Sequence, residues 1–352
     1  MADTQVKVKA HRPFSLKLFL MRFRTIIALL VIVVIFATLS KHFFTIQNIL
    51  LMTRHVAINA FLAIGMTFVI VSGGIDLSVG SIVGLTGMVI GALIDVGIPL
   101  KIFGVVIYLH TWFILIVALA AGGIIGAMNG FIITRLKVAP FIATLGMLYV
   151  ARGFALLSNN GSTFPFLNGQ PDLGNTGFPF IGEGNILAIP VPIWLLVIVA
   201  LLAAFLAKRT PLGRHIYAVG GNERAAGLSG VRVNAVRFRV YVISGVLAAV
   251  SGIIVASQLV AAQPASGESY ELNAIAAAVL GGTSLMGGRG SIGGTIIGAF
   301  VIGILSDGMI MVGISDFWQM VIKGLVIIVA VAIDQLQASV FQAAAIQEER
   351  RG

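Results

Sequence analysis

The chain has 352 residues, of which 58% are hydrophobic and 10% charged, and its mean hydropathy is +1.04. A soluble domain carries roughly a quarter charged residues, so this composition indicates an integral membrane protein with little soluble mass. The net charge of +10 does not indicate a nucleic-acid partner, because the charges lie in short segments beside apolar runs, where they orient a membrane protein. The absence of cysteine excludes disulfides, cysteine-ligated zinc and thiol chemistry.

The N-terminal part of the chain is basic and then strongly apolar. Residues 1–24 carry six basic residues and one acid, which predicts a cytoplasmic N-terminal tail. The apolar run over residues 25–39 has no small-residue cleavage site after it, so we predict an uncleaved first span. Further apolar runs approach or exceed the ~20 residues needed to cross a membrane. These predicted spans are residues 48–72, 82–94, 112–134, 140–157, 193–207, 240–262, 272–286, 292–312 and 317–334.

Two connections between the spans differ in charge. Residues 208–239 hold seven Lys and Arg against one acid, which predicts a cytoplasmic loop, whereas residues 158–190 hold two acids and no Lys or Arg, which predicts an outside loop. On the complete map, 18 of the 23 basic residues lie inside and two outside. The predicted fold class is all-α: a polytopic integral membrane protein with about ten transmembrane helices over residues 25–335. Its N-terminus and its C-terminal tail, residues 336–352, are predicted to be cytoplasmic.

Two stretches share one pattern, an apolar helix followed by Gly-Gly, a short polar break and Gly-Ser-Ile. They are residues 57–84, with Gly73-Gly74 and Gly80-Ser81-Ile82, and residues 274–294, with Gly281-Gly282 and Gly290-Ser291-Ile292. Transporters often contain structural repeats whose interrupted helices line the transport path near the membrane midplane. The pattern indicates either such a repeat or a chance match in a chain with 42 glycines.

The middle of the basic loop does not look like an ordinary connection. Asn222 is suited to cap a short helix over Glu223–Leu228 that stops near Gly230. A short helix on a cytoplasmic loop is a natural docking surface for a soluble partner. The alternative is that the arginines only set the topology, which requires charges but no capped helix. The candidate docking residues are Gly220, Gly221, Asn222, Glu223, Arg224, Ala225, Ala226, Ser229 and Gly230.

Polar residues inside predicted spans are the second group of candidates. A charge at a span centre costs roughly 2.5–3.5 kcal/mol on insertion scales, so such a residue usually faces a cavity or a partner. Asp76 is expected either to cap the third span or to contact substrate, and the asparagines either to bind a hydroxylated substrate or to bridge helices. Asp307 and Lys323 are candidates for a structural ion pair between the last two spans. The candidate path residues are Asn59, Asp76, Ser78, Asn129 and Asn273.

Motifs for enzymatic chemistry are weak throughout. No Gly-x-x-x-x-Gly-Lys-Ser/Thr occurs, so the chain is not expected to hydrolyse ATP by itself. Residues 288–293 match a dinucleotide fingerprint by letter, but no strand of a βαβ unit precedes them, and we treat the match as false. The five histidines have no zinc-ligand spacing, and no metal or cofactor is expected on this chain.

Several of these stretches together resemble one family. Residues 73–80, Gly-Gly-Ile-Asp-Leu-Ser-Val-Gly, and the loop 210–231 are similar to the sugar-type permeases of ATP-binding-cassette importers, the ribose, xylose, arabinose and galactose group. The further matching stretches are Asn129-Gly130, residues 140–146, residues 281–294, Trp318-Gln319, Lys323-Gly324 and Asp334. The resemblance spans about residues 45–335, and the long outside loop 158–190 departs from the pattern.

The resemblance implies a permease subunit of the bacterial inner membrane. In that family two permease chains, identical or related, form the path, two cytoplasmic ATPases that carry ATP and Mg²⁺ dock on the loop helix, and a periplasmic sugar-binding protein delivers a monosaccharide or polyol. The alternatives are a related permease for branched-chain amino acids or nucleosides, an ion-driven secondary transporter, and a channel or purely structural membrane protein.

Overall fold

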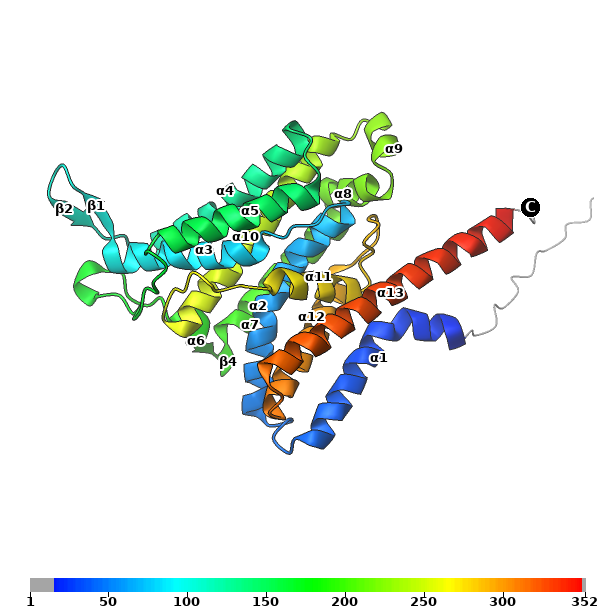
Figure 1. Ribbon diagram of the computed structural model, residues 1–352, viewed down its shortest axis with the longest axis horizontal. Helices are drawn as coiled ribbons and strands as arrows, with labels where there is room; N and C mark the ends of the chain where they lie inside the picture. The colour runs from blue at the N-terminus through cyan, green and yellow to red at the C-terminus, as the bar shows by residue number, and fades with distance from the viewer. Residues whose placement is uncertain (1–15, 350–352) are drawn as a thin grey trace, which may run out of the picture.

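The computed structural model describes the backbone of residues 16–349 and the side chains of residues 25–332. Helices make up most of it (Figure 1). The helices are α1 (Leu16–Leu39), α2 (Ile46–Val71), α3 (Val79–Gly91), α4 (Thr111–Arg135), α5 (Pro140–Leu157), α6 (Phe180–Glu183), α7 (Val191–Arg209), α8 (Pro211–Gly221), α9 (Glu223–Leu228), α10 (Val233–Leu259), α11 (Tyr270–Leu280), α12 (Ile292–Met311) and α13 (Asp316–Glu349). A π-helical turn, Ala92–Val96, extends α3, and a 3₁₀ turn, Pro171–Leu173, precedes α6.

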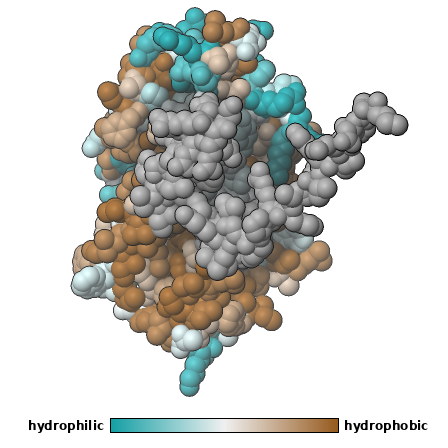
Figure 2. Space-filling model, turned by 90° about the vertical axis from the view of Figure 1, so that its right-hand side faces the viewer, coloured by the Kyte–Doolittle hydropathy of each residue, from teal (hydrophilic) through white to brown (hydrophobic). Residues whose placement is uncertain are grey.

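Seven of the described segments are long and apolar enough to cross a membrane, which confirms a polytopic, mostly helical membrane protein. They are α2, α3 with its π turn, α4, α5, α7, α10 and α12. Thr25–Leu39 and α11 are apolar but shorter, so the predicted number of ten spans stays a prediction. Figure 2 shows hydrophilic side chains gathered at one end of the molecule and a broad hydrophobic surface below them.

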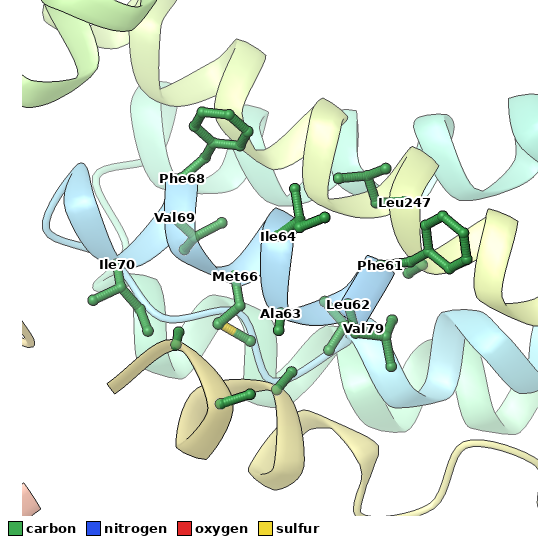
Figure 3. Packing of buried hydrophobic residues seen from close by; sticks show 14 of the residues in the cluster. Phe61, Leu62, Ala63, Ile64, Met66, Phe68, Val69, Ile70, Val79 and Leu247 are labelled. Carbon is green, nitrogen blue, oxygen red and sulfur yellow. The ribbon is translucent and has the colours of Figure 1, made fainter. Parts of the chain in front are cut away.

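Helix α2 lies at the centre of the bundle. Its buried side chains face α10 and α11 on opposite sides, as Figure 3 shows, and α12 also packs against it. A helix that is apolar all round is stable only when neighbours surround it. Small residues allow those neighbours to approach closely, because a Cβ at Gly65 would lie 3.1 Å from the Cα of Ser244.

The most extensive helix–helix contact joins α4 to α10 through glycines at every fourth position of α4. Gly122, Gly126 and Gly130 face the backbone of α10, and a Cβ at Gly126 would collide with the carbonyl oxygen of Tyr241. On α10, Gly245 packs against the backbone of Gly122 in the same way. Small residues spaced by four let helix backbones touch without a hydrophobic driving force in lipid. These two helices therefore form a closely packed pair.

The connections contain structure that the sequence interpretation did not predict. Residues 95–110 include a hairpin of β1 (Ile98–Leu100) and β2 (Val105–Ile107), and residues 158–190 include α6 and the short strands β3 (Asn185–Ile186) and β4 (Ile189–Pro190). The first hairpin lies at the end of the molecule opposite α9 (Figure 1). The all-α prediction is thus correct for the bundle and incomplete for these two connections.

Both chain ends differ from the predicted domain limits. Helix α1 begins at Leu16, inside the predicted tail 1–24, and α13 continues without a break to Glu349 through most of the predicted tail 336–352. The predicted tail is therefore helical over residues 336–349, and its separation from the membrane-spanning part stays a prediction. Residues 1–15 and 350–352 lie outside the described residues, and the cytoplasmic location of both ends stays a prediction.

Candidate functional site

The first helix break lies between α2 and α3. Helix α2 ends at a glycine turn in which Gly73 has φ +85° and the Gly74 N–H donates to the Val69 carbonyl at 3.0 Å. This 6→1 bond is the usual C-terminal cap of a helix that ends on a left-handed residue. The chain then runs back along α2, so that Val79 at the start of α3 lies near Leu62 (Figure 3). Non-helical backbone is thus placed inside the bundle, where membrane proteins tolerate it only when protein surrounds it.

Asp76 is at the centre of this break and is fully buried. Its Oδ1 accepts the Ser78 N–H at 3.0 Å and the Ser78 hydroxyl at 2.6 Å, and its Oδ2 accepts the Ser244 hydroxyl of α10 at 2.8 Å. The predicted helix cap is wrong in detail, because Ser78 occupies the N-cap position of α3 and makes no side-chain cap bond. Asp76 instead closes a local turn and ties the break to α10.

Side chains from two more helices complete this cluster. The Asn129 amide of α4 donates to the Ser78 hydroxyl at 2.8 Å, and the Thr144 hydroxyl of α5 donates to the Ile75 carbonyl at 3.2 Å. Asn129 lies six residues before the end of α4, about 9 Å along the helix at 1.5 Å per residue. The break is therefore braced well inside the membrane-spanning part of the molecule.

Two buried polar atoms beside the break have no partner among the described residues. They are the Asn129 Oδ1 and the Tyr241 hydroxyl, and Tyr241 packs so closely on Gly74 that a Cβ there would collide with its oxygen. Buried polar groups are nearly always hydrogen-bonded, so an unused acceptor and an unused hydroxyl at one place are notable. They are groups that a hydroxylated ligand can satisfy.

The structure brings together three of the five predicted path residues. Asp76, Ser78 and Asn129 share the cluster, whereas Asn59 and Asn273 make no side-chain hydrogen bond to it. Asn59 lies in the middle of α2, with its Oδ1 buried and unpartnered among the described residues, and Asn273 is half-buried in the first turn of α11.

The ion pair proposed between Asp307 and Lys323 is wrong. The Asp307 Oδ1 lies 3.2 Å from the Nδ1 of His55 on α2, and its Oδ2 has no partner among the described residues. Asp307 therefore joins α12 to α2 and not to α13.

The second helix break, between α11 and α12, begins with the same turn. Gly282 has φ +89°, the Thr283 N–H donates to the Ala278 carbonyl at 3.0 Å, and Ser291 caps α12. The predicted pair of breaks is confirmed, with Gly73 matching Gly282 and the N-cap Ser78 matching Ser291. The sequence alignment of the two stretches was therefore out of register, by one residue at the turn and by more at the following helix.

The two breaks meet at the end of α2. The Gly288 N–H of the second break donates to the Val71 carbonyl at 2.9 Å, and the Thr67 and Thr295 hydroxyls, from α2 and α12, lie 2.6 Å apart. The C-terminal carbonyls of a helix have no partner within the helix, so Gly288 satisfies one that α2 leaves free.

Helix α8 also ends at this junction. A Cβ at Gly220 would collide with the Val71 carbonyl oxygen, and one at Gly288 would lie 2.8 Å from the Cα of Gly221. The Tyr217 hydroxyl donates to the Gly290 carbonyl at 2.9 Å. Burial raises the pKa of Tyr217, so the phenol keeps the proton that it donates. Gly220, predicted as a docking residue, is half-buried and contacts its own chain.

The short helix predicted in the basic loop is confirmed as α9. The Asn222 side chain accepts the Ala225 N–H at 2.9 Å, Ser229 occupies the C-cap, and Gly230 ends the turn at φ +86°. The two carboxylate oxygens of Glu223 accept hydrogen bonds from the two Nη atoms of Arg237, at 3.0 and 2.8 Å, and this pair joins α9 to α10.

The surface of α9 is almost entirely open. Ala226 is the one buried residue of the helix, while Arg224 and Ala225 are exposed and Leu228 is 90% exposed. An apolar side chain held out on a polar loop is typical of an interaction surface, although a single one does not identify the partner.

Comparison with known proteins connects this arrangement to a family. The family described as "Branched-chain amino acid transport system / permease component" matches residues 48–331, which include both breaks and the basic loop. The chain belongs to this family of transport permeases. No solved structure matches the chain.

Full-length relatives of this permease are named for sugar transport. The ribose import permease protein RbsC of Haemophilus influenzae is 43% identical over 321 residues, covering 91% of this chain and 95% of the relative. The D-allose transport system permease protein AlsC of Escherichia coli is 37% identical and covers 95% and 98%. The xylose transport system permease protein XylH of Escherichia coli is 34% identical and covers 92% and 93%.

Family membership and the seven apolar spans make the permease a multi-pass protein of the bacterial inner membrane. It is a transport subunit and not itself an enzyme. Among the residues that the structure describes, no three His, Asp or Glu side chains gather in a way that could hold a metal ion.

Four residues of the permease sites were missed by sequence reasoning. Tyr241 and Ser244 line the first break from α10, Thr144 braces it from α5, and Leu228 is exposed on α9. Tyr241 and Ser244 are three residues apart, so they share one face of an otherwise apolar helix. That spacing was the available signal, since a polar face on a spanning helix needs a polar partner.

Proposed function

We propose that this permease is the transmembrane subunit of an ATP-driven importer for an aldose sugar, with ribose the first candidate. The observation that carries this proposal is 43% identity to ribose import permeases over nine-tenths of both chains. The allose and xylose permeases are less similar, at 37% and 34%, but belong to the same chemical class of cargo. The alternative cargo of branched-chain amino acids is not favoured, because these relatives are named for sugars.

In the proposed assembly a cytoplasmic ATPase docks on α9. The exposed side chains of Arg224, Ala225 and Leu228 support this role, as does the bidentate Glu223–Arg237 pair that fixes the helix on α10. ATP and Mg²⁺ bind the ATPase, and this chain carries neither. A periplasmic binding protein delivers the sugar to the opposite end of the molecule, and a second permease chain completes the path.

The first break is the proposed contact with the sugar. Asp76 is fully engaged by Ser78 and Ser244, which supports a positioning role for the carboxylate. The Oδ1 of Asn129 and the hydroxyl of Tyr241 are buried without a partner among the described residues, and we propose that they bond to sugar hydroxyls when the path opens. A site at an interrupted helix inside the bundle agrees with the usual position of transporter sites. Asn59 and Asn273 stay candidates for other parts of the path.

Reconstitution tests this function. The permease is purified from its native membrane with the ATPase that accompanies it and placed in vesicles, and uptake of labelled ribose is measured with its binding protein, with and without ATP. Labelled leucine is the matched cargo control. ATP-dependent ribose uptake supports the proposal. Leucine uptake in its place assigns the other cargo, and uptake driven by an ion gradient without ATP contradicts the importer mechanism.

A further inference from the structure

A cleft of about 1040 Å³ opens where the end of α4 meets the start of α10. Three arginines line it: Arg135, the last residue of α4, Arg232, the N-cap of α10, and Arg239 in the second turn of α10. Two aromatic side chains, Phe131 and Phe238, line the same cleft and are 52% and 37% exposed. The cleft thus offers a triple positive charge and an apolar wall in one place.

The positive charge of this cleft is not neutralised within the described part of the chain. Glu223 is the only acid in residues 208–239, and Arg237 occupies both of its oxygens. No described acidic side chain forms a salt bridge with Arg135, Arg232 or Arg239. A guanidinium group is suited to bind a phosphate with two parallel hydrogen bonds. The chemistry of the cleft therefore calls for an anion.

The position of the cleft shows what else the occupant contains. The outward face of α4 is a continuous apolar stripe that ends one turn before Arg135. Its exposed members include Trp112, Phe113, Ile116, Ile124, Met128 and Phe131. This helix is one of the apolar spans, so the cleft lies where a membrane-facing surface reaches the cytoplasmic side. An occupant that matches both the arginines and the apolar stripe has an anionic head and a hydrocarbon tail.

We propose that this cleft binds an anionic phospholipid of the cytoplasmic leaflet. The phosphate lies among Arg135, Arg232 and Arg239, and an acyl chain follows Phe131 along α4. Basic pockets at the cytoplasmic ends of spans are a known mode of lipid recognition. A soluble partner would match the arginines but not the apolar stripe. The site lies next to α9, because Arg237 of α10 holds Glu223, so the lipid stabilises the segment from which α9 projects.

The test compares the permease with two triple variants in nanodiscs. The first replaces Arg135, Arg232 and Arg239 by Gln. The matched control replaces Lys208, Arg209 and Arg214, which are exposed basic residues that do not line the cleft. Both variants lose three positive charges. Phospholipid retained after delipidation is quantified by mass spectrometry, and phosphatidylglycerol binding is compared with phosphatidylcholine and inorganic phosphate.

The wild type and the control variant are expected to retain phosphatidylglycerol. Each arginine near an anionic headgroup contributes roughly fivefold in affinity, so the cleft variant is expected to lose more than tenfold. Equal retention by all three proteins, or an equal loss in both variants, would overturn the proposal. Binding of inorganic phosphate as tight as that of the lipid would assign a free-anion site instead.

Two further results separate lipid binding from a folding defect and from ATPase docking. Thermal unfolding in phosphatidylcholine shows whether the cleft variant folds, and the single variant Arg239→Gln, expected to lose about fivefold, replaces it if it does not. Unchanged lipid retention with loss of ATPase binding would make the cleft part of the docking surface and sink the lipid proposal. Because sugar uptake is not a readout, the test stands apart from the proposed cargo.

Discussion

The two helix breaks begin with the same turn and then serve different purposes. The break between α2 and α3 returns into the bundle and buries Asp76 and Ser78 completely. The break between α11 and α12 is longer, contains exposed residues such as Met286 and Arg289, and lies against α8. The turn itself, a glycine at positive φ after a helix, is therefore only a way to stop a helix. The residues that follow it decide whether the break becomes a polar site or a joint.

The contrast also shows how each break satisfies its backbone. The first uses side chains from α4, α5 and α10, whereas the second uses mainly backbone contacts among glycines. Side-chain hydrogen bonds fix one arrangement of polar atoms, which suits recognition. Backbone contacts between glycines fix the distance between two elements, which suits transmission of movement. The following four changes test this division, from the largest expected effect to the smallest.

Replacing Asp76 by Ala should have the largest effect. It leaves the Ser78 N–H and the hydroxyls of Ser78 and Ser244 buried without their acceptor. Because a hydroxyl can rotate toward another acceptor, we expect one of the three to find a new partner and the loss of stability to be roughly 3 kcal/mol. Thermal unfolding in detergent and ATP-driven uptake are the measurements. Asp95→Ala, at an exposed carboxylate, is the control and should stay within about 0.5 kcal/mol. Equal losses in both variants would remove the special role of the first break.

Replacing Gly220 by Ala should disturb the joint. The new methyl group collides with the Val71 carbonyl, and overpacking of this kind costs about 1–3 kcal/mol. We expect fewer sugars imported for each ATP hydrolysed. Gly221→Ala adds the same methyl group at the next residue, where nothing lies within 4 Å, and should behave as wild type. If both variants couple normally, α8 does not transmit movement to the breaks.

Replacing Asn222 by Ala removes the cap of α9 and should cost about 1 kcal/mol of helix stability. The expected result is weaker binding of the ATPase, measured by titration against the purified permease. Asn222→Ser retains a capping oxygen and should restore most of the affinity. Unchanged binding in the alanine variant would show that α9 does not need to be a preformed helix.

The smallest effect is expected at the contact between α2 and α12. Thr67→Val removes the contact with the buried Thr295 hydroxyl, which keeps its bond to the Ser291 carbonyl, and also removes the Thr67 bond to the Ala63 carbonyl. We expect a loss of about 1 kcal/mol in thermal unfolding. Changing both threonines to Val should cost less than the sum of the two single changes, which a double-mutant cycle detects. Thr53→Val, which removes only a bond to the preceding turn of α2, is the reference. Additive losses would show that the two hydroxyls do not interact.

Local signals in the sequence predicted the local features correctly. Asn222 and Gly230 mark the limits of α9, and the glycine doublets mark both breaks. Helix α8 was missed because Pro211, Gly213 and Gly220 are typical of a loop. In the structure Pro211 occupies the first helical turn behind the Thr210 cap, where proline is tolerated, and Gly220 is required by its contact with Val71.

Partners in space could not be predicted in the same way. The sequence contains many hydroxyl groups that could donate to Asp76, and only the packing of α10 places Ser244 beside it. Asp307 contacts His55, 252 residues away, because α12 lies against α2. Their charge and their depth in the membrane indicated that Asp76 and Asp307 need hydrogen-bond partners. Several helices carry side chains that could serve as those partners. The relative rotation of the helices decides which side chain becomes the partner. Hydrophobic periodicity does not determine that rotation in a nearly uniformly apolar chain.

The carbonyl of Val71 is contacted by Gly220 and Gly288, which come from distant parts of the chain. Contacts made by bare backbone have no rotamers with which to yield, so this joint has little compliance. A small displacement of α8 is passed on to the end of α2 and to the second break, since close-packed interiors transmit strain and do not absorb it. The permease therefore has a stiff element between the surface that carries α9 and its interior, and this stiffness comes from glycines, which have no side chain.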